Sequence, residues 1–212
     1  DGAERTNNRQ YYTFTEDDKY IVALNKEDEL IVYNFKENER IEKDVADIVA
    51  MSEDKILYEK ESILYVRSIN PKKDDRLKVT EDYDANIRFS EDGKNIIYTD
   101  GDRKLHIFNI KKDKDETIAK DVSSYYCDDK SCEKMFFVES ADTKTVYYYN
   151  GKDRESMVKD IYSINAYDVS EKQLVYTKID DKEYSLYYQK VGNDPVLVED
   201  GLTSLRTVKL FK

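Results

Sequence analysis

The stretch Ile87-Arg88-Phe89-Ser90-Glu91-Asp92-Gly93-Lys94-Asn95-Ile96-Ile97-Tyr98-Thr99 decides the fold of this chain. Two short runs rich in β-forming residues, 87–90 and 95–99, flank a polar Glu-Asp-Gly-Lys turn. Gly93 can adopt the positive φ that tight hairpin turns require. The stretch therefore predicts an antiparallel β-hairpin.

The residues that follow extend this hairpin into a larger unit. A second turn is expected at 100–103, a third strand at 104–110, a charged loop at 111–115 and a fourth strand at 116–122. Four short strands joined by tight turns form a meander. The same plan predicts second strands at 20–24, 55–58, 135–138 and 173–177, and third strands at 30–35, 63–69, 145–149 and 184–189.

The unit recurs along the chain with a period of 38 to 40 residues. An aspartate marks this period, and three copies stand in similar words, Lys43-Asp44-Val45, Lys120-Asp121-Val122 and Lys159-Asp160-Ile161. A four-stranded unit repeated about every 40 residues is typical of a β-propeller blade. The chain contains no Trp, which disfavours the WD-repeat version. The recurring aspartates are Asp44, Asp82, Asp121, Asp160 and Asp200.

We therefore predict an all-β fold, a β-propeller of four-stranded antiparallel blades. Five blades are favoured over a fragment of a larger propeller, because ring closure leaves no unpaired sheet edge. Residues 1–10 are expected to form a polar N-terminal arm, and residues 11–212 a single domain. The expected blades are 11–45, 46–84, 85–122, 123–161 and 162–201, with a closing strand in 202–212. Recurring aromatics are expected to pack between blades: Tyr33, Tyr65, Phe108, Tyr148 and Tyr188.

Residues 87–98 also resemble the Phe-Ser-Pro-Asp-Gly-Lys repeat of TolB-like β-propellers, with Glu91 in place of the proline. Residues 51–58 and 169–176 echo it, and 15–19 do so more faintly. The resemblance implies a blade, and such propellers generally serve as protein-binding modules or as lids and scaffolds beside other domains. The chain also resembles uncharacterised propeller ectodomains of Gram-positive cell-surface proteins. That resemblance implies a bacterial protein that is extracellular or on the cell surface.

Charge and hydropathy exclude several kinds of partner. The 212 residues carry a formal net charge of −11, which repels the phosphate backbone of nucleic acids. No run of 18 apolar residues is present, so no membrane-embedded segment is expected. Because the chain begins with Asp1 rather than Met, a leader or an anchor upstream of it is expected.

The five recurring aspartates are candidate binding residues. In a propeller they are expected to enter loops on one face, where they would offer an acidic seat for a basic peptide or metal ions. Turn chemistry is the alternative and favoured interpretation, because Asp hydrogen-bonds its own backbone in short turns. No segment matches an EF-hand loop, and Cys127, Cys132 and His106 lack the spacing of zinc ligands. No cofactor or metal is therefore expected.

Cys127 and Cys132 are the two cysteines of the chain, and they lie in the turn between the first two strands of the fourth blade. Two interpretations stay open: a disulfide across the hairpin loop, or two free thiols in a cytoplasmic protein. The disulfide is favoured because the ends of a hairpin come close enough and because it suits an extracellular chain.

Signs of catalysis are weak. His106 is the sole histidine, and no Gly-x-Ser-x-Gly word accompanies it. A carboxylate-based glycoside hydrolase or lyase stays as an alternative, with Asp128 and Asp168 as the acids that the first strands offer. A further alternative is the propeller part of a larger enzyme. The leading hypothesis is a non-catalytic, extracytoplasmic binding or scaffold module that recognises a protein, peptide or glycan through its loops.

Overall fold

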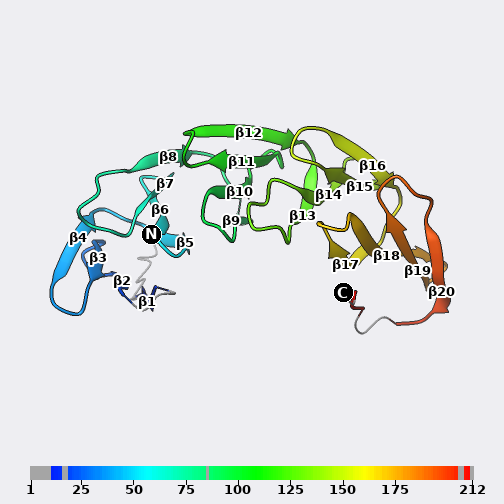
Figure 1. Cartoon of the computed structure of the whole chain (residues 1–212), viewed down its shortest axis with the longest axis horizontal. Coiled ribbons are helices and arrows are strands. Elements are labelled where there is room, and N and C mark those ends of the chain that lie inside the picture. The colour runs from blue at the N-terminus through cyan, green and yellow to red at the C-terminus, as the bar shows by residue number, and fades with distance from the viewer. Residues whose placement is uncertain (1–10, 16–18, 85, 205–207, 211–212) are drawn as a thin grey trace, which may run out of the picture. The chain divides into compact units, whose positions relative to one another are not determined.

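The computed structural model describes residues 11–15, 19–84, 86–204 and 208–210. These residues form twenty β-strands and no helix (Figure 1). The strands make five four-stranded antiparallel sheets, and in each sheet the strands follow one another in chain order. The prediction of an all-β protein with five four-stranded blades is confirmed, and this set of sheets is consistent with a five-bladed β-propeller.

The sheets are defined by the following strands. The first sheet contains β1 (Tyr11–Phe14), β2 (Ile21–Leu24), β3 (Leu30–Tyr33) and β4 (Asn38–Glu42). The second contains β5 (Asp47–Met51), β6 (Lys55–Lys60), β7 (Ile63–Ser68) and β8 (Leu77–Thr80). The third contains β9 (Ile87–Phe89), β10 (Asn95–Thr99), β11 (Leu105–Asn109) and β12 (Lys114–Ala119). The fourth contains β13 (Val122–Tyr126), β14 (Met135–Ser140), β15 (Lys144–Tyr149) and β16 (Arg154–Val158). The fifth contains β17 (Ser163–Asp168), β18 (Gln173–Asp180), β19 (Glu183–Lys190) and β20 (Val196–Leu202).

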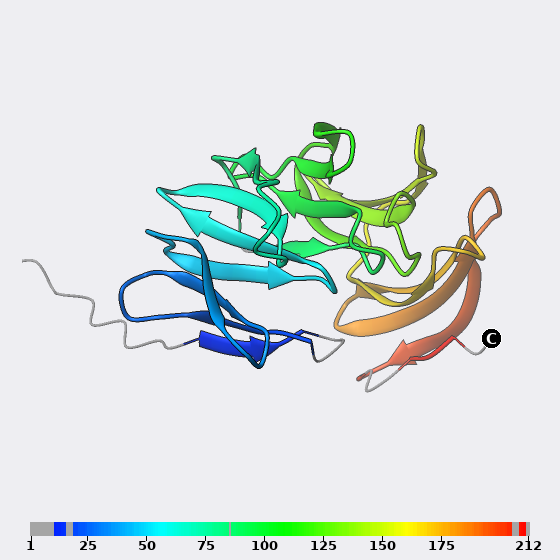
Figure 2. The ribbon, with the colours of Figure 1, turned by 60° about the vertical axis from the view of Figure 1, so that its left-hand side comes forward.

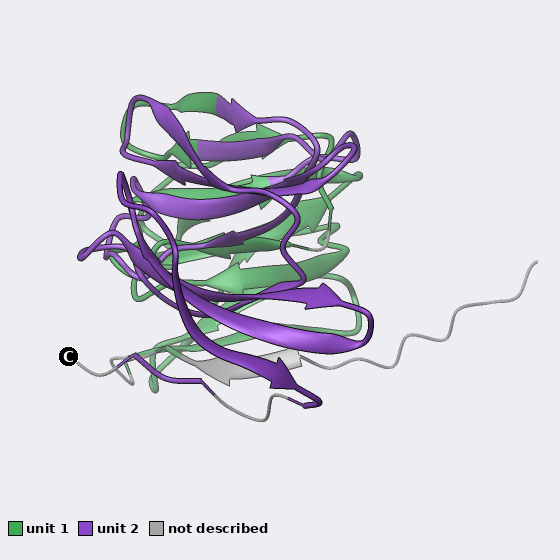
Figure 3. Ribbon diagram, turned by 90° about the vertical axis from the view of Figure 1, so that its right-hand side faces the viewer, with its two compact units in different colours: residues 1–98, 108–116 green, residues 99–107, 117–212 purple. Residues whose placement is uncertain are grey.

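The chain divides into two compact units, which are coloured separately in Figure 3. The first unit comprises residues 1–98 and 108–116, and the second comprises 99–107 and 117–212. The division runs through the third sheet, so that strands β10 to β12 contribute residues to both units.

The core of the first unit lies between adjacent sheets. One cluster joins the first and second sheets through Leu30 and Val32 on β3 and Ile56 and Tyr58 on β6. A second cluster joins the second sheet to residues of the third, among them Phe108. Packing of this kind buries the apolar face that a single blade cannot bury alone.

The second unit is built in the same way. Its core cluster joins the fourth sheet, through Phe136 and Tyr148, to the fifth, through Leu174 and Tyr176. The four strands of the fifth sheet, yellow to red, lie side by side in Figure 2. Phe108 and Tyr148 thus pack between sheets as expected, while Tyr33 and Tyr188 are only partly buried.

Two blade boundaries differ from the prediction. The fourth strand expected at 116–122 ends at Ala119, and Val122 is the first residue of the next sheet. The reason is the conformation of Asp121, whose φ of 55° breaks the extended chain. The fifth sheet also extends beyond Asp200, because β20 runs to Leu202.

Both predicted terminal segments include residues outside the described part. The polar arm at 1–10 lies outside it entirely. Of the segment expected to close the ring, Leu202 belongs to β20, and the described residues 203–204 and 208–210 are not in a strand. The described residues contain no helix long and apolar enough to cross a membrane.

Candidate functional site

Three of the five recurring aspartates share one backbone conformation. Asp44, Asp121 and Asp160 have φ values of 57°, 55° and 57°. Asp and Asn adopt this left-handed conformation more readily than other side chains except glycine. The three residues therefore lie in equivalent turns between one sheet and the next.

A backbone hydrogen bond made by the residue after each of these aspartates explains why the three-residue motif Lys-Asp-Val/Ile recurs. The Val45 N–H donates to the Asp28 carbonyl (2.9 Å), and the Val122 N–H donates to the Arg103 carbonyl (2.9 Å). The Ile161 N–H makes the equivalent, longer bond to the Lys144 carbonyl (3.4 Å). Each acceptor lies at or next to the turn between the second and third strands, and each aliphatic side chain is buried. This geometry supports the turn interpretation of the repeated aspartate.

Asp82 and Asp200 are placed differently. The Asp82 backbone bonds the side chain of Thr80, whose hydroxyl accepts its N–H and donates to its carbonyl. Asp200 lies inside β20, where its Oδ1 accepts the Ser185 hydroxyl (2.6 Å) and the Gly201 N–H (2.9 Å). These two bonds hold the pKa of Asp200 below its ordinary value. At these two positions the aspartate recurs in the sequence, but the turn conformation found at the other three aspartates does not.

Asp121 borders a surface groove of about 590 Å³ that lies entirely within the second unit. One wall is the end of β12 and the turn that follows it, residues 117–121. Glu139 on β14 and Arg154 on β16 form the rest of the lining. Asp121 is the residue of this groove that the sequence analysis singled out as a candidate binding residue. We call the groove the β12 groove.

Charged pairs are fixed on both walls of the β12 groove. Arg103 donates to Asp121 Oδ1 (3.0 Å), and Arg154 donates to Glu139 Oε1. The Arg154 guanidinium also lies over the ring of Tyr147, 5.2 Å from its centroid. Burial, and then the negative charge of Glu139, raise the pKa of Tyr147. Arg154 is thus held in place by a carboxylate and an aromatic face.

The wall formed by β12 is also the edge of a sheet. β12 pairs with β11 on one side, and in the described part of the chain no strand pairs with its other side. An edge strand presents backbone N–H and C=O groups that can bind an extended segment. The β12 groove therefore combines backbone hydrogen-bonding groups with fixed charges of both signs.

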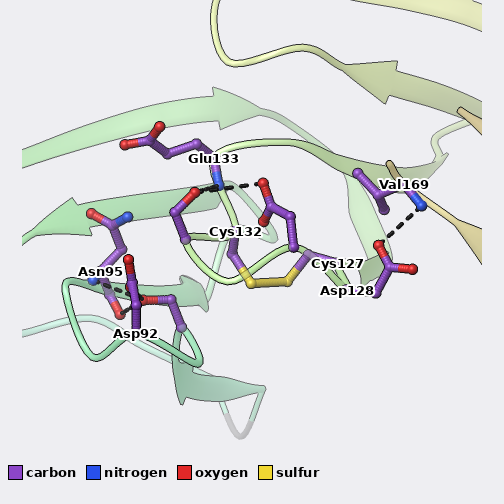
Figure 4. The surroundings of a disulfide bond; sticks show 10 residues. Asp92, Asn95, Cys127, Asp128, Cys132, Glu133 and Val169 are labelled. Atoms are coloured by element: carbon purple, nitrogen blue, oxygen red, sulfur yellow. Dashed lines mark hydrogen bonds between the residues drawn. A yellow bond between two sulfur atoms is a disulfide. The ribbon is translucent and has the colours of Figure 1, made fainter. Parts of the chain in front are cut away.

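The acids proposed for a hydrolase have structural partners. Asp128 Oδ1 accepts the Val169 N–H (3.0 Å), as Figure 4 shows. Asp168 Oδ1 accepts the Ser170 hydroxyl (2.6 Å) and the Glu171 N–H (3.0 Å). Asp168 therefore organises the turn that follows β17, and Asp128 links the β13–β14 loop to that turn.

His106 pairs with one carboxylate. Its Nε2 lies 3.3 Å from Asp100 Oδ2, and both residues are buried. Burial favours a higher pKa for Asp100, but the Lys104 N–H and the imidazole of His106 outweigh it and lower that pKa. Among the residues that the structure describes, no three His, Cys, Asp or Glu side chains gather as a metal ion would need.

Cys127 and Cys132 form a disulfide across the loop between β13 and β14 (Figure 4). Their Cα atoms lie 5.4 Å apart, and both residues are buried. The bond spans the loop whose next residue after Cys127 is Asp128, the partner of Val169. It therefore constrains the β13–β14 loop of the fourth sheet, which contacts the fifth sheet through the hydrogen bond between Asp128 and Val169.

A partly buried ionic cluster in the first unit escaped sequence analysis. Glu42, the last residue of β4, accepts hydrogen bonds from Lys60 (3.0 Å), Arg76 (2.9 Å) and the Tyr58 hydroxyl (3.1 Å). Burial alone would raise the pKa of Glu42, but these bonds and the Lys43 N–H lower it from 4.5 to about 2. Burial and the charge of Glu42 raise the pKa of Tyr58. Partners 16 to 34 positions apart give no local signal in the sequence.

Arg76 repeats the arrangement found in the β12 groove. Its guanidinium lies 5.1 Å from the centroid of Tyr65, which stacks on Tyr58 at 5.8 Å. In the fourth sheet, Arg154 covers Tyr147, which stacks on Phe137 at 5.4 Å. Arginine on tyrosine is thus a recurring device, and in the β12 groove it forms part of an open wall.

An asparagine at the end of the third strand is a second signal that sequence analysis missed. Asn34 Oδ1 accepts the N–H groups two and three residues later (3.0 and 3.0 Å), and Asn150 Oδ1 does the same (3.0 and 2.9 Å). Such bonds stabilise a turn. Its recurrence at similar spacing was visible in the sequence: Asn34, Asn70, Asn109 and Asn150.

Comparison with known proteins gives similarity in fold. No protein-family model and no curated protein matches the chain. Among solved structures, the N-terminal domain of Nup159 is 12% identical, with a TM-score of 0.49 over 90% of this chain and 60% of that one. The β-propeller domain of the Trilobed protease from Pyrococcus furiosus is 13% identical, with a TM-score of 0.49 over 84% and 66%. TolB from Acinetobacter baumannii is 14% identical, with a TM-score of 0.42 over 91% and 55%.

The chain therefore spans between 55% and 66% of the length of these three structures. TolB and a propeller domain of a protease are thus among the structures to which the chain is similar. The TolB-like repeat family and the Gram-positive surface context stay predictions.

Proposed function

We propose that this β-propeller module is a non-catalytic binding or scaffold module that holds an extended peptide segment of another protein in the β12 groove. The observation that carries the proposal is the pairing of a sheet edge, β12, with the fixed Arg154–Glu139 pair in one groove. Backbone groups of the edge would supply affinity, and the charged pairs would select side chains of the segment.

Two further observations support parts of the proposal. The Cys127–Cys132 disulfide suits an oxidising compartment, which supports an extracytoplasmic location. The structural hydrogen bonds of Asp128 and Asp168 favour a binding module over a hydrolase, because a general acid must reach its substrate.

A peptide-display selection tests the proposal. Random twelve-residue peptides are selected on the chain, and enriched peptides are measured by fluorescence anisotropy. We expect the double variant Glu139→Gln/Arg154→Ala to weaken binding by about tenfold or more, since central charged contacts dominate such interfaces. The charge-swapped variant Glu139→Arg/Arg154→Glu keeps an ion pair in place and serves as a control for folding, while its preferred peptides should carry reversed charges.

Two results would contradict the proposal. One is a selection that enriches no peptide above the blank surface. The other is a set of peptides that bind the double variant as tightly as the original chain.

A further inference from the structure

The last strand of the fifth sheet, β20, presents an unusual edge. Three successive apolar residues at its start are exposed: Val196 to 58%, Leu197 to 50% and Val198 to 54%. One side of β20 pairs with β19, and in the described part of the chain no strand pairs with the other side. Val196 and Leu197 pair with successive residues of β19 and so point to opposite faces, which exposes apolar side chains on both faces of this edge. Val198 is the extra residue of a β-bulge between Leu197 and Glu199.

The fourth strands of the other sheets are different. Each has a charged residue within its first three positions: β4 begins Asn-Glu-Arg, β8 Leu-Lys-Val, β12 Lys-Asp-Glu and β16 Arg-Glu-Ser. Charges on an edge strand prevent unwanted pairing with other chains. β20 begins Val-Leu-Val and lacks this protection, although the repeat offers four examples of it.

The second half of β20 is acidic. Glu199 and Asp200 follow the apolar residues directly. The hairpin that joins β18 to β19 adds acids next to them, since a Cβ built on Gly201 would lie 3.8 Å from Glu183 Oε2. Asp180 and Asp181 lie at the tip of this hairpin. The edge is therefore aliphatic at one end and negatively charged at the other.

A second copy of the chain fits this edge poorly. Antiparallel pairing of two β20 strands centred on Val198 would place Leu197 opposite Glu199 and Val196 opposite Asp200. Parallel pairing in register would place like carboxylates side by side, which is destabilising. The net charge of −11 adds a general repulsion between copies.

From these observations we infer that β20 receives a strand from a partner protein, whose added segment is aliphatic at one end and rich in Lys or Arg at the other. The segment extends the fifth sheet by backbone hydrogen bonds, its aliphatic end covers Val196–Val198, and its basic end faces Glu199 and Asp200. This surface is distinct from the β12 groove, so the inference goes beyond the proposed function.

Two synthetic peptides test the inference, because an added strand can run in either direction. Lys-Arg-Lys-Thr-Val-Ile-Val suits antiparallel addition, and Val-Ile-Val-Thr-Lys-Arg-Lys suits parallel addition. Binding to the full chain is measured by fluorescence anisotropy at low and moderate salt. We expect one of the two peptides to bind saturably. An analogue in which Glu replaces each Lys and Arg should bind at least about tenfold more weakly.

Variants and modified peptides identify the mode of binding. Val198→Lys should weaken binding by about tenfold or more. Phe35→Lys is the matched control, because it places the same charge at another exposed apolar position, 49% exposed, and should leave binding unchanged. In an added strand, alternate backbone N–H groups of the peptide donate to β20 and the others face away from it. Methylating the nitrogens of the first set should therefore abolish binding, whereas methylating those of the second set should not.

The outcomes separate this inference from the proposed function. Glu139→Gln/Arg154→Ala should not affect binding at β20, whereas it should affect the β12 groove. The inference is overturned if neither peptide binds, if Val198→Lys binds as well as the original chain, or if methylated peptides bind equally. Concentration-dependent dimerisation in sedimentation, lost in Val198→Lys, would instead assign the edge to a second copy and would also overturn it.

Discussion

The carboxylate of Glu42 lies 3.1 Å from the hydroxyl of Tyr58, and so joins the fourth strand of the first sheet to the second strand of the next. Lys60 and Arg76 complete the cluster with hydrogen bonds of 3.0 and 2.9 Å. The side chain of Glu42 is only 10% exposed. Its negative charge therefore depends on these partners rather than on water.

Replacing this carboxylate should destabilise the first unit. Glu42→Gln keeps the shape of the side chain but leaves Lys60 and Arg76 without their counter-charge. We expect a loss of about 2–3 kcal/mol in the free energy of unfolding, the scale of hydrogen bonds to charged groups. Urea denaturation measures it, with Glu39→Gln in the same strand as the control. A loss equal to that of the control would show that the cluster contributes nothing.

The same carboxylate should make stability depend on pH. Its pKa falls from 4.5 to about 2 on folding, so the folded state favours the ionised form. The stabilisation is present above pH 4.5 and is lost as the pH falls from there toward 2. Thermal melts between pH 6 and pH 2.5 should show this loss, and Glu42→Gln should remove part of the slope. An identical slope in the variant would contradict the assignment.

The recurring aspartates should tolerate Asn better than Ala. Asn adopts the left-handed conformation of Asp121, whereas other side chains lose about 1 kcal/mol or more there. We expect Asp121→Asn to change the free energy of unfolding little and Asp121→Ala to lower it by about 1 kcal/mol. Asp82→Ala is the control, because Asp82 does not have positive φ. Equal effects of Asn and Ala at Asp121 would argue against the turn interpretation.

Two equivalent turns differ in the residue that adopts the left-handed conformation, which is Gly in one and Phe in the other. Gly151 (φ 95°) and Phe35 (φ 65°) follow Asn150 and Asn34 in turns with the same side-chain bonds. Gly151→Ala should destabilise by about 1–2 kcal/mol, the cost of a left-handed conformation with a side chain. Phe35→Gly should stabilise by about 0.5–1 kcal/mol, since relief of that cost exceeds the loss of an exposed contact with Tyr33. Calorimetry measures both, and a destabilised Phe35→Gly would refute the argument.

The disulfide gives a chemical prediction. Protein secreted into an oxidising medium and then denatured without reductant should expose no reactive thiol. Removing the bond with Cys127→Ala/Cys132→Ala should lower the free energy of unfolding by about 2 kcal/mol, the expected value for a short loop. Two thiols per chain before reduction would contradict both the bond and the compartment that it supports.

Local patterns predicted the strands well. The strand expected at 95–99 is observed with the same bounds as β10, because a polar turn follows each run of β-formers. The third strand expected at 30–35 ends instead at Tyr33, since Asn34 begins a turn with its side chain. Fourth strands were harder, as the boundary at Asp121 depends on backbone conformation and not on hydrophobic pattern.

The candidate site was predicted in part only. Asp121 could be recognised from the sequence because it recurs with the repeat. Glu139 and Arg154 line the same groove only because strand pairing in the fourth sheet brings them together, and the sequence does not show that pairing. The Glu42 cluster likewise joins residues of two sheets. The exposed β20 edge could be recognised only after β19 and β20 were known to pair, because an apolar run alone predicts a buried strand.

The hydrogen bond from Val45 to the Asp28 carbonyl, with its counterparts at Val122 and Ile161, uses backbone atoms alone. A connection fixed in this way requires only two kinds of residue: one that tolerates the left-handed conformation, and an aliphatic residue directly after it. Surrounding side chains can then drift while the repeat is duplicated, lost or exchanged. Blades could therefore be transplanted among the three positions that share this connection while leaving it intact.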